Sequence, residues 1–271
     1  MLSQPAVPET TPVCPDHAGE PTTGTCERCG RFLCAQCTQP VPSLCVPCHA
    51  RQLRTLPHTS GRAKWTRGVL YAGVAVAAVT GLLHAWLILN LEGGTTPSLE
   101  DAQAYDSLNV ALTLASSLVM VTTIISYLRW LHLSVKTAVS LGVSTEEPRW
   151  AVFAWFIPFY NLVKPYEVVR DLWLNLGGAP AQQALLRGWW AAWLIGNGLS
   201  NVSASLFNKI GDGGVAISTA LTVGMISEAI SVLSSVLCIR VIEDIESMIA
   251  SRRADLDTVI ARADAQQPSL G

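Results

Sequence analysis

The sequence predicts a mainly α-helical protein, with a small cysteine-rich module at the N-terminus and a polytopic helical membrane domain of four spans and one re-entrant or interfacial segment. Charged residues make up only 14% of the 271-residue chain, against about 25% in soluble proteins. Apolar residues are concentrated in long blocks. Seven of the eight cysteines lie between Cys14 and Cys48, so we expect them to act together in one short module. The net charge of -2 does not suggest a nucleic-acid partner.

Residues 1–13 are rich in proline and threonine, and we expect them to form a disordered leader. They lack the basic start and apolar core of a secretory signal. We therefore expect the cysteine-rich module to lie in a reducing compartment, where thiols stay free to bind metal.

The cysteine-rich module, residues 14–49, carries four pairs of metal-ligand residues, each with two intervening residues. That spacing lets both side chains of a pair reach one ion, and zinc takes four nitrogen or sulfur ligands in a tetrahedron. Seven cysteines cannot all form disulfides, and a histidine fills the eighth position. The module is therefore predicted to be stabilised by two Zn²⁺ ions, held by Cys14, His17, Cys26, Cys29, Cys34, Cys37, Cys45 and Cys48.

Two pairings of these ligands are open. Only four residues separate Cys29 from Cys34, which disfavours placing the second and third pairs on one ion. An interleaved arrangement, with pairs one and three on one zinc and pairs two and four on the other, is preferred, and the sequential arrangement stays open. His49 either replaces Cys48 or is a bystander, and we expect a bystander.

This module resembles a B-box-type zinc finger. It begins Cys-x-x-His, and residues 30–34, GRFLC, lead from the second pair into the first cysteine of the third pair as they do in that family. The last pair is Cys-x-x-Cys, where many B-boxes use histidines. The resemblance implies a protein-interaction module with no active site of its own, and with every ligand position filled there is no place for a catalytic water.

The linker, residues 50–68, carries five basic residues and no acid, which places it on the cytoplasmic side and next to anionic lipid headgroups. The membrane domain, residues 69–242, is predicted to contain spans at 69–91, 108–128, 188–208 and 215–239. The second helix should continue past the membrane and stop at Gly142. A turn containing residues 209–214 joins the last two spans, and both termini are cytoplasmic.

Residues 149–173 form the segment that decides this topology. The run is apolar from 150 to 163, which is too short to span a bilayer as a helix. Pro158 interrupts it and Pro165 closes it, so we expect it to dip into the membrane or lie on it. An amphipathic helix should follow Pro165 and end at Gly177 and Gly178.

The same segment carries a second resemblance, through Trp155-Phe156-Ile157-Pro158, Asn161, Pro165, Trp173 and the pair Trp189-Trp190. These residues are similar to those of a bacterial membrane family catalogued as domain of unknown function 4328, over roughly residues 65–250. The resemblance implies an architecture, a bacterial source and thus an inner membrane, but no activity. The motif either shapes the dip, with Asn161 bonding to backbone carbonyls freed by the prolines, or lines a ligand or headgroup site.

Two ionisable side chains, His84 and Glu228, fall well inside the predicted spans. Both lie roughly 21–22 Å from the cytoplasmic ends of their helices at about 1.5 Å per residue. Such residues usually face the protein interior. We therefore hypothesise a polar cluster of His84, Glu228, Asn197 and Asn201, which is either structural or a proton or ion relay.

The tail, residues 243–271, is predicted to continue the last helix into the cytosol and to fray from residue 264. Its apolar residues either form a short coiled coil, which would make a homo-oligomer, or pack against the chain's own helices; they are Ile242, Ile245, Ile249, Leu256 and Ile260.

No nucleophile–base pair, phosphate loop or carboxylate pair lies in a water-facing segment, so we do not expect an enzyme. The sequence favours a membrane-anchored adaptor or sensor that recruits a cytoplasmic protein through its finger, with membrane lipids as further partners. The alternative is a small transporter or channel-like protein that uses the finger as a regulatory module. A zinc-dependent ligase is disfavoured, because the finger resembles B-boxes and not catalytic RING domains.

Overall fold

The structure is a computed structural model that describes residues 12–37, 43–56, 58–94, 98–144, 146–210 and 217–265. The chain divides into two compact units. One contains Met1–Pro57 with Ala250–Gly271, and the other contains His58–Ile249. Most of the predicted leader, most of the turn at 209–214 and the end of the tail lie outside the described residues.

The first unit is built on a minimal hairpin. Strands β1 (Gly24–Thr25) and β2 (Phe32–Leu33) pair antiparallel, with Gly24 opposite Leu33. Gly30 has a φ of 71° in the turn between them, which a residue without a Cβ adopts at no steric cost. Helix α1 (Val46–Arg54) follows, with a proline in its first turn, where no backbone N–H is needed.

The same unit includes the end of helix α7 (Ile217–Ala265). Arg54 of α1 forms an ion pair with Asp257 at 2.7 Å, and the guanidinium of Arg253 donates to the carbonyl of Leu56 at 3.4 Å. Ile260 is buried. The tail thus contacts the chain's own helix α1, and the coiled-coil alternative stays a prediction.

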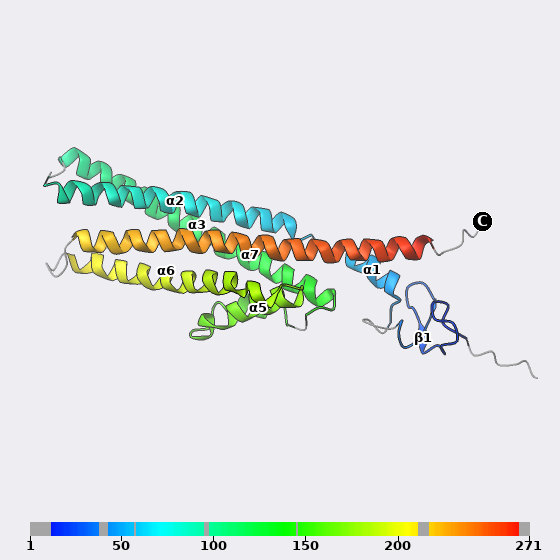
Figure 1. The fold of residues 1–271 in the computed structure, drawn as a ribbon. Helices are drawn as coiled ribbons and strands as arrows, with labels where there is room; N and C mark the ends of the chain where they lie inside the picture. The colour runs from blue at the N-terminus through cyan, green and yellow to red at the C-terminus, as the bar shows by residue number, and fades with distance from the viewer. Residues whose placement is uncertain are drawn as a thin grey trace, which may run out of the picture. The chain divides into compact units, whose positions relative to one another are not determined.

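The second unit is dominated by long helices (Figure 1). Helices α2 (Ser60–Glu92) and α3 (Leu99–Ser140) form an antiparallel pair, in which Gly73 faces Val119 and Trp86 stacks on Tyr105. A capping box at Ser98 and Asp101 begins α3. As predicted, α3 continues beyond its apolar stretch, and Gly142 follows its end with a φ of 72°.

Helix α6 (Gln183–Ile210) packs antiparallel to α7. Gly188 lies opposite Leu237, Gly196 lies opposite Ser231, and the hydroxyl of Ser203 donates to the carbonyl of Ala220 at 3.5 Å. Small residues allow this close approach of two helices. Figure 1 shows α6 and α7 side by side along the full length of α6.

Three described helices are long and apolar enough to span a membrane: Ser60–Glu92, Leu99–Ser140 and the α7 stretch Ile217–Arg262. The predicted fourth span is not confirmed, because α6 is not among them. The physical reason is visible in its sequence, which mixes three tryptophans with Asn197, Asn201 and Asn208 and so lowers its hydropathy. The predicted linker is also mostly helical, since α1 ends at Arg54 and α2 begins at Ser60.

Between α3 and α6 the chain forms short elements: helix α4 (Trp150–Phe153), the 3-10 helix η1 (Tyr160–Leu162), helix α5 (Lys164–Asn175) and the 3-10 helix η2 (Pro180–Gln182). None is long enough to cross a bilayer. The predicted amphipathic helix is α5, whose buried face carries Val168, Val169, Leu172 and Trp173. Gly177 follows it with a φ of 109°, as the predicted stop requires.

Candidate functional site

The hairpin explains why neighbouring cysteine pairs bind different ions. Cys26 and Cys29 lie in the turn that follows β1, whereas Cys34 and Cys37 lie beyond the end of β2. Because the strands are antiparallel, these two pairs leave the hairpin at opposite ends. The backbone N–H of Cys26 donates to the carbonyl of Arg31 at 2.8 Å, which closes the turn.

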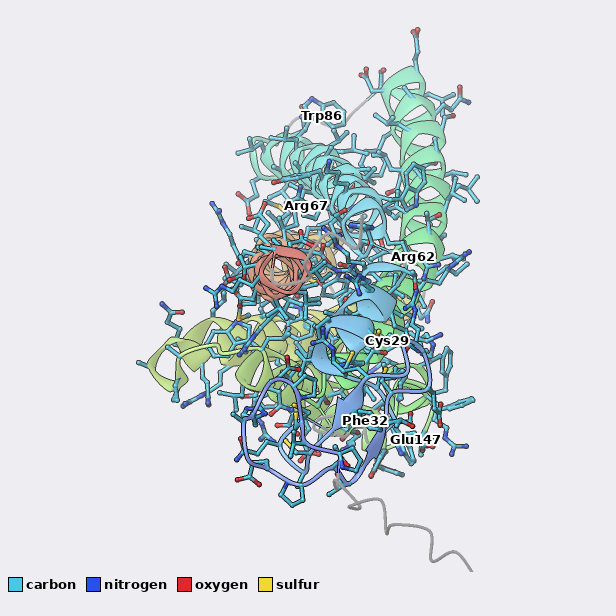
Figure 2. The ribbon with its side chains drawn as sticks, turned by 90° about the vertical axis from the view of Figure 1, so that its right-hand side faces the viewer. Cys29, Phe32, Arg62, Arg67, Trp86 and Glu147 are labelled. Carbon is cyan, nitrogen blue, oxygen red and sulfur yellow. The ribbon has the colours of Figure 1, made fainter. Side chains whose placement is uncertain are left out.

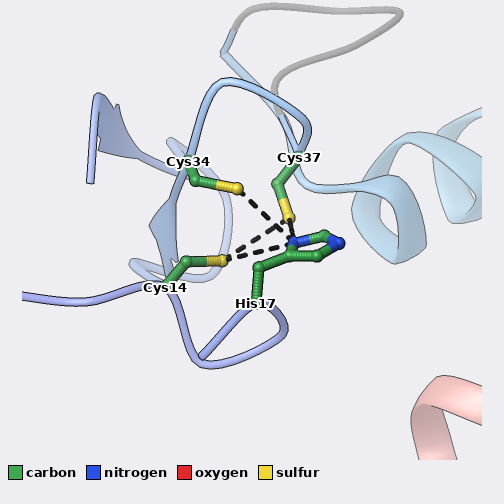
Figure 3. A group of neighbouring side chains, drawn as sticks. All are labelled: Cys14, His17, Cys34 and Cys37. Atoms are coloured by element: carbon green, nitrogen blue, oxygen red, sulfur yellow. Dashed lines mark hydrogen bonds between the residues drawn. The ribbon is translucent and has the colours of Figure 1, made fainter. Parts of the chain in front are cut away.

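The first tetrad consists of Cys14, His17, Cys34 and Cys37 (Figure 3). The Sγ atoms of Cys14 and Cys37 are 3.6 Å apart. Nδ1 of His17 lies 3.4 Å from Sγ of Cys34 and 3.3 Å from Sγ of Cys37. Nδ1 is therefore the histidine atom that points to the centre of the group.

The second tetrad consists of Cys26, Cys29, Cys45 and Cys48. Cys45 is the residue that precedes α1, and Cys48 lies in its first turn. The Sγ atoms of Cys29 and Cys45 are 3.7 Å apart, and the backbone N–H of Cys45 donates to Sγ of Cys26 at 3.4 Å. The start of α1 therefore supplies half of this site.

Both tetrads fit a zinc ion. A tetrahedron with Zn–S bonds of about 2.3 Å places neighbouring sulfurs about 3.8 Å apart, close to the observed 3.6 and 3.7 Å. In each group all four ligand atoms lie within 4.8 Å of one another. The interleaved pairing is thus confirmed, and His49, outside both tetrads, is the predicted bystander.

The electrostatics of the thiols divides them into two kinds. Burial opposes ionisation of Cys14, but hydrogen bonds with His17 and nearby backbone N–H groups outweigh it and lower the pKa to about 6. Burial is likewise outweighed at Cys26, where backbone N–H groups lower the pKa to about 6. Burial and the neighbouring thiols raise the pKa of Cys37 to about 12. Zinc binds thiolates, so each tetrad already contains one thiol that favours the binding form.

The predicted re-entrant segment is arranged around Trp155. Its indole lies edge-on to Trp190 and Trp193, at centroid distances of 5.8 and 5.5 Å. Nε1 of Trp190 donates to the carbonyl of Leu162 at 3.0 Å, which ties η1 to α6. The tryptophans therefore hold the segment against the helices from one side.

The other side of the segment is apolar and exposed. Phe156 and Phe159 are 65% and 86% exposed, and Phe159 is the non-glycine residue with a positive φ, 62°, among the described residues. Pro158 is also exposed, and its carbonyl accepts from the backbone N–H of Tyr160 at 2.7 Å. An exposed apolar surface of this kind is more stable in contact with lipid than with water.

The other residues of the predicted re-entrant motif are buried or take part in local backbone hydrogen bonds. Pro165 is buried in the first turn of α5, and Trp173 is buried beneath Gly178, whose backbone N–H donates to the carbonyl of Trp173 at 2.9 Å. Asn161 donates its backbone N–H to the carbonyl of Ile157 at 3.0 Å. The predicted hydrogen bonds of its side-chain amide to freed carbonyls stay a prediction.

Comparison with known families accounts for both parts of the chain. Residues 9–41 match the B-box zinc finger family. Residues 94–247, more than half of the chain, match the family described as domain of unknown function DUF4328. The chain belongs to the DUF4328 family. No curated protein and no solved structure matches it.

His84 and Glu228 lie on two facing helices, α2 and α7. The His84 ring is 8% exposed and faces Gly224 of α7, where an added Cβ would lie 3.6 Å from Nδ1 and 3.3 Å from the hydroxyl of Ser203. Nδ1 has no hydrogen-bond partner among the described residues. Glu228, one turn beyond Gly224, lines a groove of about 390 Å³ together with Gly81 and Ala85 of α2.

The two asparagines of the predicted cluster are placed elsewhere. Asn197 and Asn201 are exposed, and their amides donate to carbonyls one turn earlier in α6, of Trp193 at 2.7 Å and of Asn197 at 2.8 Å. The face of α6 that contacts α7 carries Gly196 and Ser203 instead. The structure therefore brings His84 and Glu228 to one helix interface, but it does not place Asn197 and Asn201 in the predicted polar cluster.

Sequence analysis missed a polar site where the start of α2 meets α3 and α7. Glu246 accepts from Nε1 of Trp130 at 2.8 Å and from the hydroxyl of Thr59 at 2.9 Å. Glu243 beside it pairs with Arg67 at 2.8 Å. The signal was available, since Glu246 falls one turn after Ile242 on the otherwise apolar face of the last helix.

Proposed function

We propose that this chain is a membrane-anchored zinc-finger protein that recruits a cytoplasmic protein through its head. The observation that carries the proposal is that both tetrads contain a complete set of four ligand residues. Each ion would receive four protein ligands, and a structural site of that kind leaves no coordination position for a substrate or a catalytic water. The proposal therefore assigns the finger to docking and not to catalysis.

The surface of the finger supports a docking role. Phe32 on β2 is 45% exposed, although its strand neighbour Leu33 is fully buried (Figure 2). Aromatic side chains of this kind contribute strongly to protein interfaces. Phe32 is not a metal ligand, so it can be changed without removing zinc.

Membrane anchoring is the second part of the proposal. Three of the described helices are long and apolar enough to span a membrane, and we propose α6 as the fourth span because it packs along α7. The segment that carries Phe156 and Phe159 would insert into the cytoplasmic leaflet and return. Both termini then lie in the cytoplasm, at the inner membrane of a bacterium.

Crosslinked recovery from native membranes tests this function. The intact protein is compared with a Cys26→Ser, Cys29→Ser variant, with Phe32→Ala, and with Cys238→Ser as a matched control, since Cys238 is a buried cysteine outside the finger. We expect a cytoplasmic protein that is recovered with the intact chain and with Cys238→Ser, but not with the finger variant, and less with Phe32→Ala. Equal recovery with all four proteins would contradict recruitment by the finger.

A second candidate function, transport, is favoured by one observation. His84 is buried with an unpartnered Nδ1, and the carboxylate of Glu228 lines a groove near it. Intramembrane ionisable groups often mark ion or proton paths. Proton flux into liposomes that is abolished by Glu228→Gln, and unaffected by the finger variant, would favour transport over recruitment.

A further inference from the structure

The first turns of α2 and the second half of α3 enclose a groove that is lined by two arginines. It has a volume of about 290 Å³ and is lined by Gly61, Arg62, Trp65, Thr122, Ile125, Ser126 and Arg129. The guanidinium of Arg62 donates to the backbone carbonyl of Arg129 at 3.2 Å, which fixes both arginines at one level. Two arginines, one from each helix, therefore line one groove.

These two charges are not neutralised within the described part of the chain. Neither Arg62 nor Arg129 forms an ion pair there, and no acidic residue lines the groove. Arg67, one turn further along α2, is different, since it points toward α7 and pairs with Glu243 at 2.8 Å (Figure 2). The groove therefore presents two guanidinium groups without an acidic partner, and groups of this kind are suited to hold phosphate oxygens.

The walls of the groove change character with depth. Trp65 is 66% exposed beside the arginines, where an indole suits the headgroup region. Ile125 lies one turn from Arg129 towards the apolar part of α3, and the exposed Val121 and Leu118 continue the same side. No residue of that apolar stretch of α3 is buried among the described residues. Charge followed by an exposed apolar path is the pattern of a phospholipid.

We infer that this groove between α2 and α3 binds an anionic phospholipid, with its phosphate on Arg62 and Arg129 and its acyl chains along Ile125 and the neighbouring apolar surface of α3. The inference rests on the membrane embedding proposed above, and it adds a defined lipid site to it. Each arginine near an anionic surface contributes about 1 kcal/mol, which corresponds to about a fivefold change in affinity.

Native mass spectrometry of the full chain, purified in detergent with added phosphatidylglycerol or phosphatidylcholine, tests the inference. The test variant is Arg62→Gln with Arg129→Gln. The matched control is Lys64→Gln with Lys136→Gln, which removes one exposed charge from each of the same helices outside the groove. We expect the test variant to retain at least fivefold less phosphatidylglycerol, and the control to change by less than twofold.

Several results would overturn the lipid site. One is equal loss in test and control variants, which would indicate a general effect of surface charge. Undiminished retention in the test variant is another. Displacement of the lipid by inorganic phosphate, with phosphate bound equally well in its absence, would make this a free-anion site.

Two further measurements distinguish a failure of the lipid-site proposal from a failure of the proposed membrane embedding. An Arg62→Lys, Arg129→Lys variant keeps the charge, so it should retain most of the lipid if the test variant's loss is electrostatic. Carbonate washing of native membranes reports embedding directly. Protein that stays in the membrane pellet without preferring phosphatidylglycerol contradicts the lipid site alone, whereas protein released by the wash contradicts the embedding.

Discussion

The indole of Trp130 on α3 donates to Oε1 of Glu246 on α7 at 2.8 Å, and the other oxygen of the same carboxylate accepts from Thr59 at the start of α2. One side chain thus joins the start of α2 to α3 and α7. Trp130 is fully buried, so its N–H has no water to replace this partner.

Glu246→Ala should destabilise the helical domain by about 1–3 kcal/mol, because it leaves the buried indole N–H of Trp130 unpaired. Glu246→Gln keeps an acceptor and should cost less. Thermal unfolding in detergent measures both, and Ser247→Ala, an exposed neighbour on α7, is the control. A loss for Ser247→Ala equal to that for Glu246→Ala would contradict the assignment.

Gly178→Ala should loosen α5 from the domain. A Cβ at this position would lie 2.3 Å from Cδ2 of Trp173, which is buried and cannot move freely. Overpacking of this kind typically costs about 1–3 kcal/mol. Gly198→Ala is the matched change, because nothing lies within 4 Å of its added Cβ. Equal unfolding temperatures for the two variants would refute the close packing.

The tail should be stabilised by burial more than by its ion pair. Arg54 and Asp257 are both about half exposed, and exposed pairs contribute about 0–1 kcal/mol. Ile260 is buried, so Ile260→Ala should cost more than Asp257→Asn. Hydrogen exchange of residues 250–265 measures the difference. Greater opening in Asp257→Asn than in Ile260→Ala would contradict this ranking.

Zinc retention should depend on pH in a defined direction. The pKa values of Cys14 and Cys26 are lowered from 9.0 to about 6 in the folded finger. Thiols with lowered pKa values stabilise the fold fully above about pH 9, and this contribution is lost as the pH falls through about 6. Metal binding requires thiolates as well. Zinc measured by elemental analysis after gel filtration should therefore stay at pH 7.5 and be lost by pH 5, and full retention at pH 5 would disagree.

Features set by local spacing were predictable from the sequence. The gap between Cys29 and Cys34 favoured interleaved zinc sites, and the glycines at 177 and 178 marked the end of α5. These signals act within a few residues, so no knowledge of distant contacts is needed.

Features that depend on how a helix is rotated were not predictable. Asn197 lies next to Gly196 in sequence, yet Gly196 faces α7 and Asn197 is exposed. Small and polar residues follow one another in α6 at Gly196, Asn197 and Gly198, so their order does not show which of them faces α7. Glu246 itself could have been singled out on the apolar face of α7, but its partners Trp130 and Thr59 could not, because they come from helices distant in sequence.

The central claim is that the head contains two closed zinc sites with interleaved ligands, and two reciprocal double variants test it directly by native mass spectrometry. Cys14→Ser with Cys34→Ser removes two ligands from one tetrad, so one zinc should remain. Cys14→Ser with Cys26→Ser removes one ligand from each tetrad, so both ions should be weakened. The opposite outcome, two ions lost in the first variant and one in the second, would show sequential sites and contradict the account.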